Sequence, residues 1–110
     1  MPIFITQGRY TRESVKKMSA KPEDRTSALA SFFEKTGGKL IGWYLTFGEY
    51  DFLVISENKD VEGVAAALLA VAGKSAVADL TTTVALTASD AKKAFGKAGK
   101  LAGAYKSPGK

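Results

Sequence analysis

One segment, residues 39 to 57, gathers the side chains best able to do chemistry, because it sets an acid among aromatic residues. The acid is Asp51, and its aromatic neighbours are Trp43, Tyr44, Phe47, Tyr50 and Phe52. Desolvation by aromatic walls favours the neutral form of a carboxyl group, and a carboxylate with such a raised affinity for a proton can act as a general base or hold a donor group of a ligand. Alternatively, Asp51 accepts backbone N–H groups near a turn or pairs with Arg9 or Arg12.

Further side chains could join this site. Tyr10 and Tyr44 carry hydroxyl groups that need a partner when buried, and the planar guanidinium of Arg9 could bind an anion. The candidate ligand-binding residues are therefore Arg9, Tyr10, Trp43, Tyr44, Tyr50 and Asp51. The structural alternatives remain open: aromatic residues on strands also form cores and subunit interfaces, and an arginine on a sheet also forms salt bridges.

The absence of histidine and cysteine from all 110 residues excludes several kinds of site. Thiolate nucleophiles, zinc sites built on these residues, histidine-ligated haem and histidine acid–base catalysis are ruled out. The segment Gly37-Gly38-Lys39 leads into a predicted strand, so it lacks the geometry of a phosphate-binding loop. We therefore expect no metal site and no cofactor.

Composition predicts one globular domain, with 45% apolar and 25% charged residues. No apolar run approaches the roughly 20 residues of a membrane span, and the start MPIFITQGRY lacks a signal-peptide pattern, so we expect a cytoplasmic protein. Residues 1–88 hold ten basic and ten acidic side chains, and the net charge of +5 comes from six lysines against Asp90 in residues 89–110. The domain itself therefore gives no indication of binding nucleic acid.

Hydrophobic patterns and caps predict the order strand, helix, strand, strand, helix, strand. The expected elements are a strand over 2–10, two helical pieces over 12–20 and 22–35, a hairpin over 39–57, a helix over 61–72 capped by Asp60, and a strand over 77–87. With right-handed crossovers this order predicts an α+β, ferredoxin-like βαββαβ fold: a four-stranded antiparallel sheet with the helices on one face.

The hairpin is expected to turn at Gly48-Glu49, as a two-residue type II′ loop requires. Trp43 then pairs with Val54 on one face, and Tyr44 pairs with Leu53 on the other. The second face would lie bare in a monomer, so we expect a homodimer or larger oligomer that can enclose a pocket between two sheets.

The C-terminal region is expected to form an additional helix. Residues 1–88 would form the ferredoxin-like domain, residues 89–104 a basic amphipathic helix capped by Ser89, and residues 105–110 a disordered tail. Glycines within the helix cost roughly 1 kcal/mol each, so residues beyond about Gly99 should fray or order only against a partner.

The residues Gly48, Tyr50 and Asp51, in the context YLTFGEYD, resemble the signature of the GYD-domain family of small bacterial proteins. The resemblance extends over roughly residues 2–90, including Arg9-Tyr10-Thr11 and the helix exit Gly37-Gly38-Lys39. It implies a dimeric α/β-barrel of the ferredoxin-like type and a family without an established general activity. It does not extend to the lysine-rich end after about Phe95.

Three functions are compatible with these patterns. The first is a homo-oligomeric module that binds a small organic molecule between its sheets. The second is a cofactor-independent enzyme, catalysing proton abstraction or oxygenation, in which Asp51 removes a proton and a tyrosine stabilises the oxyanion. The third is an assembly protein whose basic C-terminal helix docks on a partner.

Overall fold

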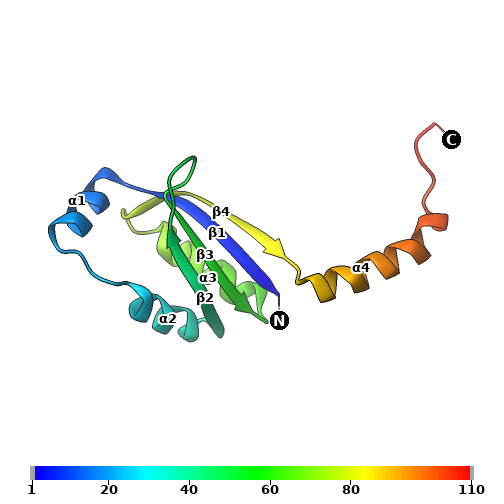
Figure 1. Ribbon diagram of the computed structural model, residues 1–110, viewed down its shortest axis with the longest axis horizontal. Helices are drawn as coiled ribbons and strands as arrows, with labels where there is room; N and C mark the ends of the chain where they lie inside the picture. Colours follow the sequence, from blue (N-terminus) through cyan, green and yellow to red (C-terminus); the bar gives the residue numbers. More distant parts are fainter. Residues whose placement is uncertain (1, 110) are drawn as a thin grey trace.

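The computed structural model describes residues 2–109 and contains one four-stranded sheet with helices (Figure 1). Its elements are β1 (Ile3–Tyr10), α1 (Arg12–Ala20), α2 (Thr26–Lys35), β2 (Gly38–Leu45), β3 (Phe52–Asn58), α3 (Val61–Ala72), β4 (Val77–Ala85), α4 (Ala88–Leu101) and a short 3₁₀ turn (Ala102–Ala104). The strand order is β2-β3-β1-β4, and all neighbours are antiparallel. This topology confirms the predicted ferredoxin-like α+β fold.

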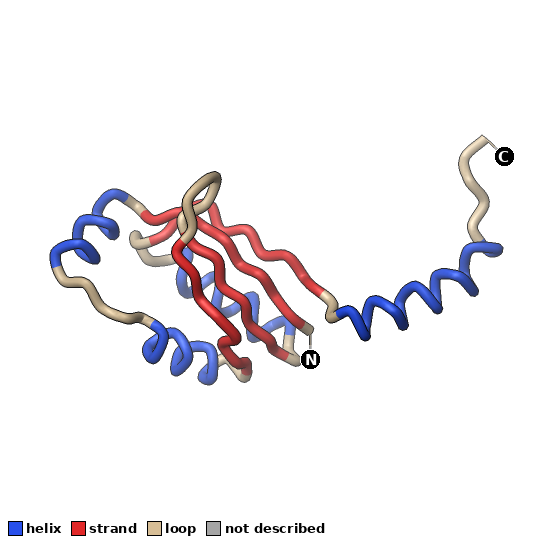
Figure 2. Tube along the Cα trace, in the orientation of Figure 1, coloured by secondary structure: helices blue, strands red, loops and turns tan. Residues whose placement is uncertain are grey.

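The helices of the ferredoxin-like unit lie on one face of the sheet (Figure 2). Side chains alternate along a strand, so Phe52, Val54 and Ser56 of β3 all point to that face, where they are buried. Phe4 on β1 and Ala67 on α3 complete the buried set on this side. The core therefore forms a single layer between the sheet and the helices.

The opposite face of the sheet has no helix over it in the described residues. Ile5 lies at its centre, between Ile55 of β3 and Thr83 of β4. Tyr44, on the outer strand β2, is 57% exposed. Apolar side chains such as Ile5, Leu53 and Ile55 lie at the centre of this face, and polar side chains such as Gln7, Thr81 and Glu57 lie around them.

The hairpin register is the predicted one, but its loop is longer. Trp43 pairs with Val54 and Leu45 pairs with Phe52, as expected. The strands end there, so residues 46–51 form the connection, and the predicted two-residue turn at Gly48-Glu49 is wrong. Two hydrogen bonds of Thr46 explain the difference. Its backbone N–H donates to the carbonyl oxygen of Asp51, and its hydroxyl donates to the carbonyl oxygen of Tyr50, so a wider loop is closed.

Two helix starts match the sequence prediction and two do not. The Thr11 hydroxyl accepts the Ser14 N–H at 3.2 Å, and the Asp60 carboxylate caps α3, as predicted. Helix α2 begins at Thr26 rather than near Pro22, because Asp24 accepts the Thr26 N–H at 2.9 Å in a turn. The Thr26 side chain and its backbone N–H hold the pKa of Asp24 below its ordinary value.

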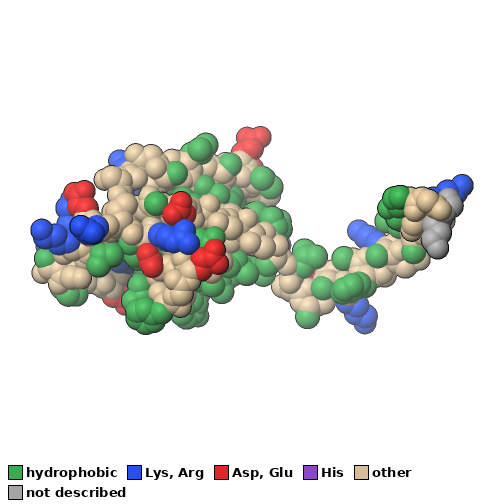
Figure 3. All heavy atoms as spheres, turned by 90° about the horizontal axis from the view of Figure 1, so that it is seen from above, with side chains coloured by type: hydrophobic (Ala, Val, Ile, Leu, Met, Phe, Trp, Pro, Cys, Tyr) green, Lys and Arg blue, Asp and Glu red, His purple; other side chains and the backbone are tan. Residues whose placement is uncertain are grey.

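The cap of α4 is Thr87, not the predicted Ser89. The Thr87 hydroxyl accepts the Asp90 N–H at 3.1 Å, so the helix starts at Ala88. Helix α4 then runs away from the sheet into open space, and Figure 3 shows its apolar and lysine side chains standing clear of the body. Phe95 and Leu101 are 77% and 65% exposed.

The projecting helix makes the described chain long and thin. Its radius of gyration is 17.9 Å and its extents are 60 × 31 × 23 Å, whereas a compact chain of this length has a radius of roughly 13 Å. Of the expected tail, residues 105–109 follow the 3₁₀ turn and contain no further helix, and Lys110 lies outside the described residues. No helix within residues 2–109 is long and apolar enough to cross a membrane.

Candidate functional site

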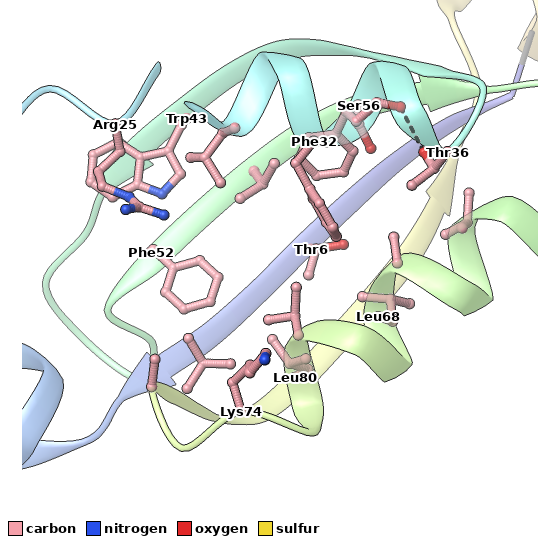
Figure 4. Close-up of a pocket in the computed structure, with 18 of the residues that line it drawn as sticks. Thr6, Arg25, Phe32, Thr36, Trp43, Phe52, Ser56, Leu68, Lys74 and Leu80 are labelled. Carbon is pink, nitrogen blue, oxygen red and sulfur yellow. Dashed lines mark hydrogen bonds between the residues drawn. The ribbon is translucent and has the colours of Figure 1, made fainter. Parts of the chain in front are cut away.

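A cavity of about 350 Å³ lies between the sheet and its helices. Every element from β1 to β4 contributes to its wall, together with the segment between α1 and α2 (Figure 4). The lining is mainly apolar and includes Met18, Leu29, Phe32, Phe33, Trp43, Phe52, Val54, Leu68, Val71 and Leu80. Its size falls within the range of small-molecule sites, roughly 300–1,000 Å³.

The cavity exists because the chain's own side chains do not fill this space. Only Phe4, Phe52, Val54 and Ala67 form the buried apolar core of the described residues, and none of them is completely buried. Helices α1 and α2 are joined by five non-helical residues, and α1 stands away from the body of the sheet (Figure 1). The helix layer therefore covers the sheet without packing tightly against it.

One end of the cavity is polar but uncharged. Asn58 donates from its side-chain amide to the Thr36 carbonyl oxygen at 3.2 Å, and its own amide oxygen accepts the Asp60 N–H. Asn58 is only 3% exposed and thereby holds the exit of α2 against the start of α3. Ser56 lies beside it in the lining, and Figure 4 shows Ser56 and Thr36 at this end.

The other end carries Tyr10, Trp43, Arg25 and Glu23. The Tyr10 ring lies against Phe52, with 4.9 Å between centroids. Burial disfavours the phenolate and raises the Tyr10 pKa above its ordinary value, while a hydrogen bond with Trp43 and the positive charge of Arg25 oppose this to a smaller extent. Tyr10 thus keeps its proton at neutral pH.

Asp51 connects the hairpin loop to β1 rather than lining the cavity. Its carboxylate accepts the backbone N–H of Tyr10 at 2.9 Å, and its own backbone N–H donates to the Gly8 carbonyl oxygen at 2.8 Å. Both bonds meet β1 where its pairing with β4 shifts register, between Gln7 and Arg9. Asp51 therefore satisfies strand groups at a β-bulge, as one of the sequence alternatives described.

Arg9 and Tyr50 form a second cluster outside the cavity lining. The Arg9 guanidinium lies 4.9 Å from the centre of the Tyr50 ring and pairs with Asp79 at 3.0 Å. The Tyr50 hydroxyl hydrogen-bonds with that of Thr81 at 3.1 Å. Asp79 has a φ of +55°, which a residue with a side chain adopts only where the surrounding structure holds it.

The structure therefore divides the candidate residues into two groups. Trp43 and Tyr10 line the cavity, whereas Arg9, Tyr44, Tyr50 and Asp51 lie outside its lining. Sequence reasoning did not single out Arg25, Phe32, Phe33 or Ser56 as site residues. The phenylalanines were visible as an apolar helical stripe, but nothing in their spacing distinguishes a cavity wall from a packed core.

No group of three or more acidic residues within residues 2–109 is placed to hold a metal ion. The polar residues of the cavity lining are Thr6, Tyr10, Ser14, Glu23, Arg25, Thr36, Trp43, Ser56, Glu57, Asn58 and Lys74.

Comparison with known proteins identifies relatives of the sequence and of the fold. The family model described as GYD domain matches residues 4–95. A search of curated proteins finds no match. Among solved structures, TTHA0845 from Thermus thermophilus is similar with a TM-score of 0.52 and 19% identity, over 80% of this chain and 96% of that one.

A second similar structure is an AsnC family transcriptional regulator from Agrobacterium tumefaciens. Its TM-score is 0.53 and its identity 17%, and the match covers 78% of this chain and 50% of that chain. At such low identity both structures show a shared ferredoxin-like fold and nothing about function.

Proposed function

The chain belongs to the GYD domain family, and from this premise we propose that it is a homo-oligomeric module that binds a small, largely apolar molecule. The proposed site is the cavity between the sheet and helices α1 to α3. A pocket between two sheets, expected from the sequence, would need a second copy and would lie on the other face. The cavity within one chain has the better support, because all of its lining residues come from a single chain.

The observation that carries this proposal is the apolar volume that the chain leaves unfilled. The lining of this volume of about 350 Å³ is mainly apolar, and the volume opens to solvent. A bound apolar molecule would remove this lining from water, and each Å² of apolar surface removed contributes roughly 25 cal/mol. This gain supports ligand binding over an empty site.

Native mass spectrometry of the protein purified from its own source tests the proposal. We expect a small extra mass under gentle conditions that is released under denaturing conditions. An Ala67→Phe variant should lose this mass, because Ala67 lines the cavity. Ala65→Phe on the exposed side of α3 is the matched control and should keep it. A wild-type protein without any adduct, together with no stabilisation by apolar compounds, would contradict the proposal.

A catalytic role for Asp51 has less support. Its carboxylate is engaged by the Tyr10 backbone N–H, and it does not line the cavity. A base that removes a proton must lie within hydrogen-bond reach of a bound substrate. The geometry of Asp51 instead supports the binding module, in which this residue holds the loop in place.

A second function, assembly through α4, is favoured by the exposure of this helix. A single 14-residue helix with two internal glycines is marginal in water. Its exposed Phe95 and Leu101 would gain from docking on another chain. Replacing both residues with serine should reduce the oligomer mass in sedimentation, whereas Lys97→Ser should not. An unchanged oligomer in the double variant would exclude this function for α4.

A further inference from the structure

We propose that the ligand of the cavity is an amphipathic organic anion, with its apolar body inside and its carboxylate or similar head group beside Arg25, Trp43 and Tyr10. This inference rests on the proposed function, because it names the chemical class that the same cavity would select. The argument depends on how donors and charges are distributed around the lining.

Two hydrogen-bond donors converge at one end of the cavity. Arg25 offers a planar set of N–H groups, and the Tyr10 hydroxyl, which burial keeps protonated, offers its proton. Figure 4 shows Arg25 and Trp43 at the same end, opposite Thr36 and Ser56. Such a set of donors suits an anionic oxygen, since arginine binds carboxylates with two parallel bonds.

Arg25 already forms a salt bridge with a carboxylate of the chain, that of Glu23. Its side chain pairs with the Arg25 guanidinium at 3.0 Å, only two positions away along the non-helical segment between α1 and α2. Both partners are about half exposed, so the pair contributes little stability and is exchangeable. Glu23 therefore occupies Arg25 when the cavity is empty, and a ligand carboxylate would compete with it.

The remainder of the lining offers one other cation, Lys74, and otherwise no free place for the head group. At the opposite end the amide of Asn58 is already bonded to Thr36 and Asp60. The walls between the two ends are apolar and aromatic, which suits the body of the ligand. Lys74 lies on the turn before β4. The experiment must therefore distinguish binding of the head group by Lys74 from binding by Arg25.

The experiment compares 4-phenylbutyrate with its neutral amide, which has nearly the same shape. Trp43 is the one tryptophan of the chain and lines the cavity, so its fluorescence reports binding of either compound. We expect the acid to bind roughly five- to tenfold more tightly than the amide, as a charge-assisted hydrogen bond would give. Calorimetric titration provides an independent measure of both affinities.

Two variants of the full chain test whether Arg25 and Glu23 determine the preference for the acid over the amide. Arg25→Gln should remove the preference for the acid, so that its affinity falls to about that of the amide. Glu23→Gln should strengthen binding of the acid, because it removes the competing carboxylate. Both residues are exposed, so neither change should prevent folding.

The outcomes separate this inference from the proposed function. Equal binding of acid and amide, abolished by Ala67→Phe, would overturn the anion class while supporting the binding module. Loss of the preference in Lys74→Gln but not in Arg25→Gln would also overturn it. If neither compound binds and no adduct is found in the native protein, both proposals fail.

Discussion

The carboxylate of Asp51 accepts the backbone N–H of Tyr10 at 2.9 Å, although the two residues are 41 positions apart. The bond joins the hairpin loop to the end of β1. It matters for the cavity because Tyr10 lines it while Asp51 does not. The loop motif that carries the family resemblance therefore acts on the site indirectly, by holding the strand that presents Tyr10.

Removing this carboxylate should destabilise the fold. Hydrogen bonds to charged groups contribute about 1.5–3 kcal/mol, so Asp51→Ala should lower the free energy of unfolding in urea by about that amount. Asp51→Asn should cost less, because its amide oxygen still accepts from Tyr10. Glu49→Ala, in the exposed part of the same loop, is the control and should change stability by less than about 0.5 kcal/mol. Equal stability of the Asp51→Ala variant and the wild type would show that the bond has no such role.

Gly8 is required by the packing of two neighbouring side chains. A Cβ at this position would lie 2.7 Å from Phe52 Cζ and 2.9 Å from Leu80 Cδ2. Both residues line the cavity, so Gly8→Ala should cost about 1–3 kcal/mol through overpacking and should also alter the cavity wall.

Thermal denaturation of Gly8→Ala and Gly96→Ala tests this explanation. Gly96 lies in α4 with nothing within 4 Å of a Cβ. Gly96→Ala should therefore not lower the melting temperature of the domain, and it should raise the helix content, because alanine is the better helix former by about 1 kcal/mol. A Gly8→Ala protein as stable as the wild type would mean that Phe52 moves aside without cost.

The sequence predicts the fold well because the fold depends on local rules. Alternating side chains set the faces of β1 and the register of the hairpin, and the short polar side chains of Thr11 and Asp60 mark true helix starts. Where two capping residues compete, the rules are less decisive. Thr87 and Ser89 are both residue types that commonly cap helices. The structure shows that the Thr87 hydroxyl accepts the hydrogen bond from the Asp90 N–H.

The site is less predictable because it depends on how tightly the helices pack. Phe32 and Phe33 have the same spacing whether they fill a core or line a cavity, so periodicity cannot separate these cases. The role of Arg25 depends on the non-helical segment after α1, which the sequence suggested to be helical. The aromatic residues around Asp51 marked a position of structural importance rather than a wall of the cavity. Asp51 there joins the hairpin loop to the bulged strand β1 by a hydrogen bond.

The raised pKa of Tyr10 predicts a loss of stability at alkaline pH. The unfolded chain releases this proton near the ordinary value of about 10, whereas the folded chain holds it to higher pH. Above that value the unfolded state binds fewer protons, so the free energy of unfolding falls as the pH rises through the folded pKa. Below it the contribution is fully present. Melting temperatures measured from about pH 9 to about pH 11 should therefore fall more steeply for the wild type than for Tyr10→Phe. Parallel curves for the two proteins would contradict the assignment to Tyr10.

The bare face of the sheet should form the interface of a homodimer. Ile55 lies beside Ile5 on this face, opposite the layer of helices. Leu53 and Tyr44 extend this apolar centre toward β2, and exposed apolar patches on a sheet often mark an interface. Ile55→Lys would place a charge in the interface, and removing that charge from water is costly unless it is paired. We therefore expect a dimer for the wild type and a shift to monomer for Ile55→Lys in sedimentation equilibrium at micromolar concentration.

Ala65→Lys is the matched control, because it adds the same charge to an exposed position on α3, away from the bare face. It should leave the dimer intact. Circular dichroism of both variants shows whether the fold is kept, so that dissociation is not confused with unfolding. The site within one chain does not depend on this outcome, since its walls come from a single copy. A wild type that sediments as a monomer would mean that the bare face is not a homodimer interface, and the pocket expected between two sheets would be excluded with it.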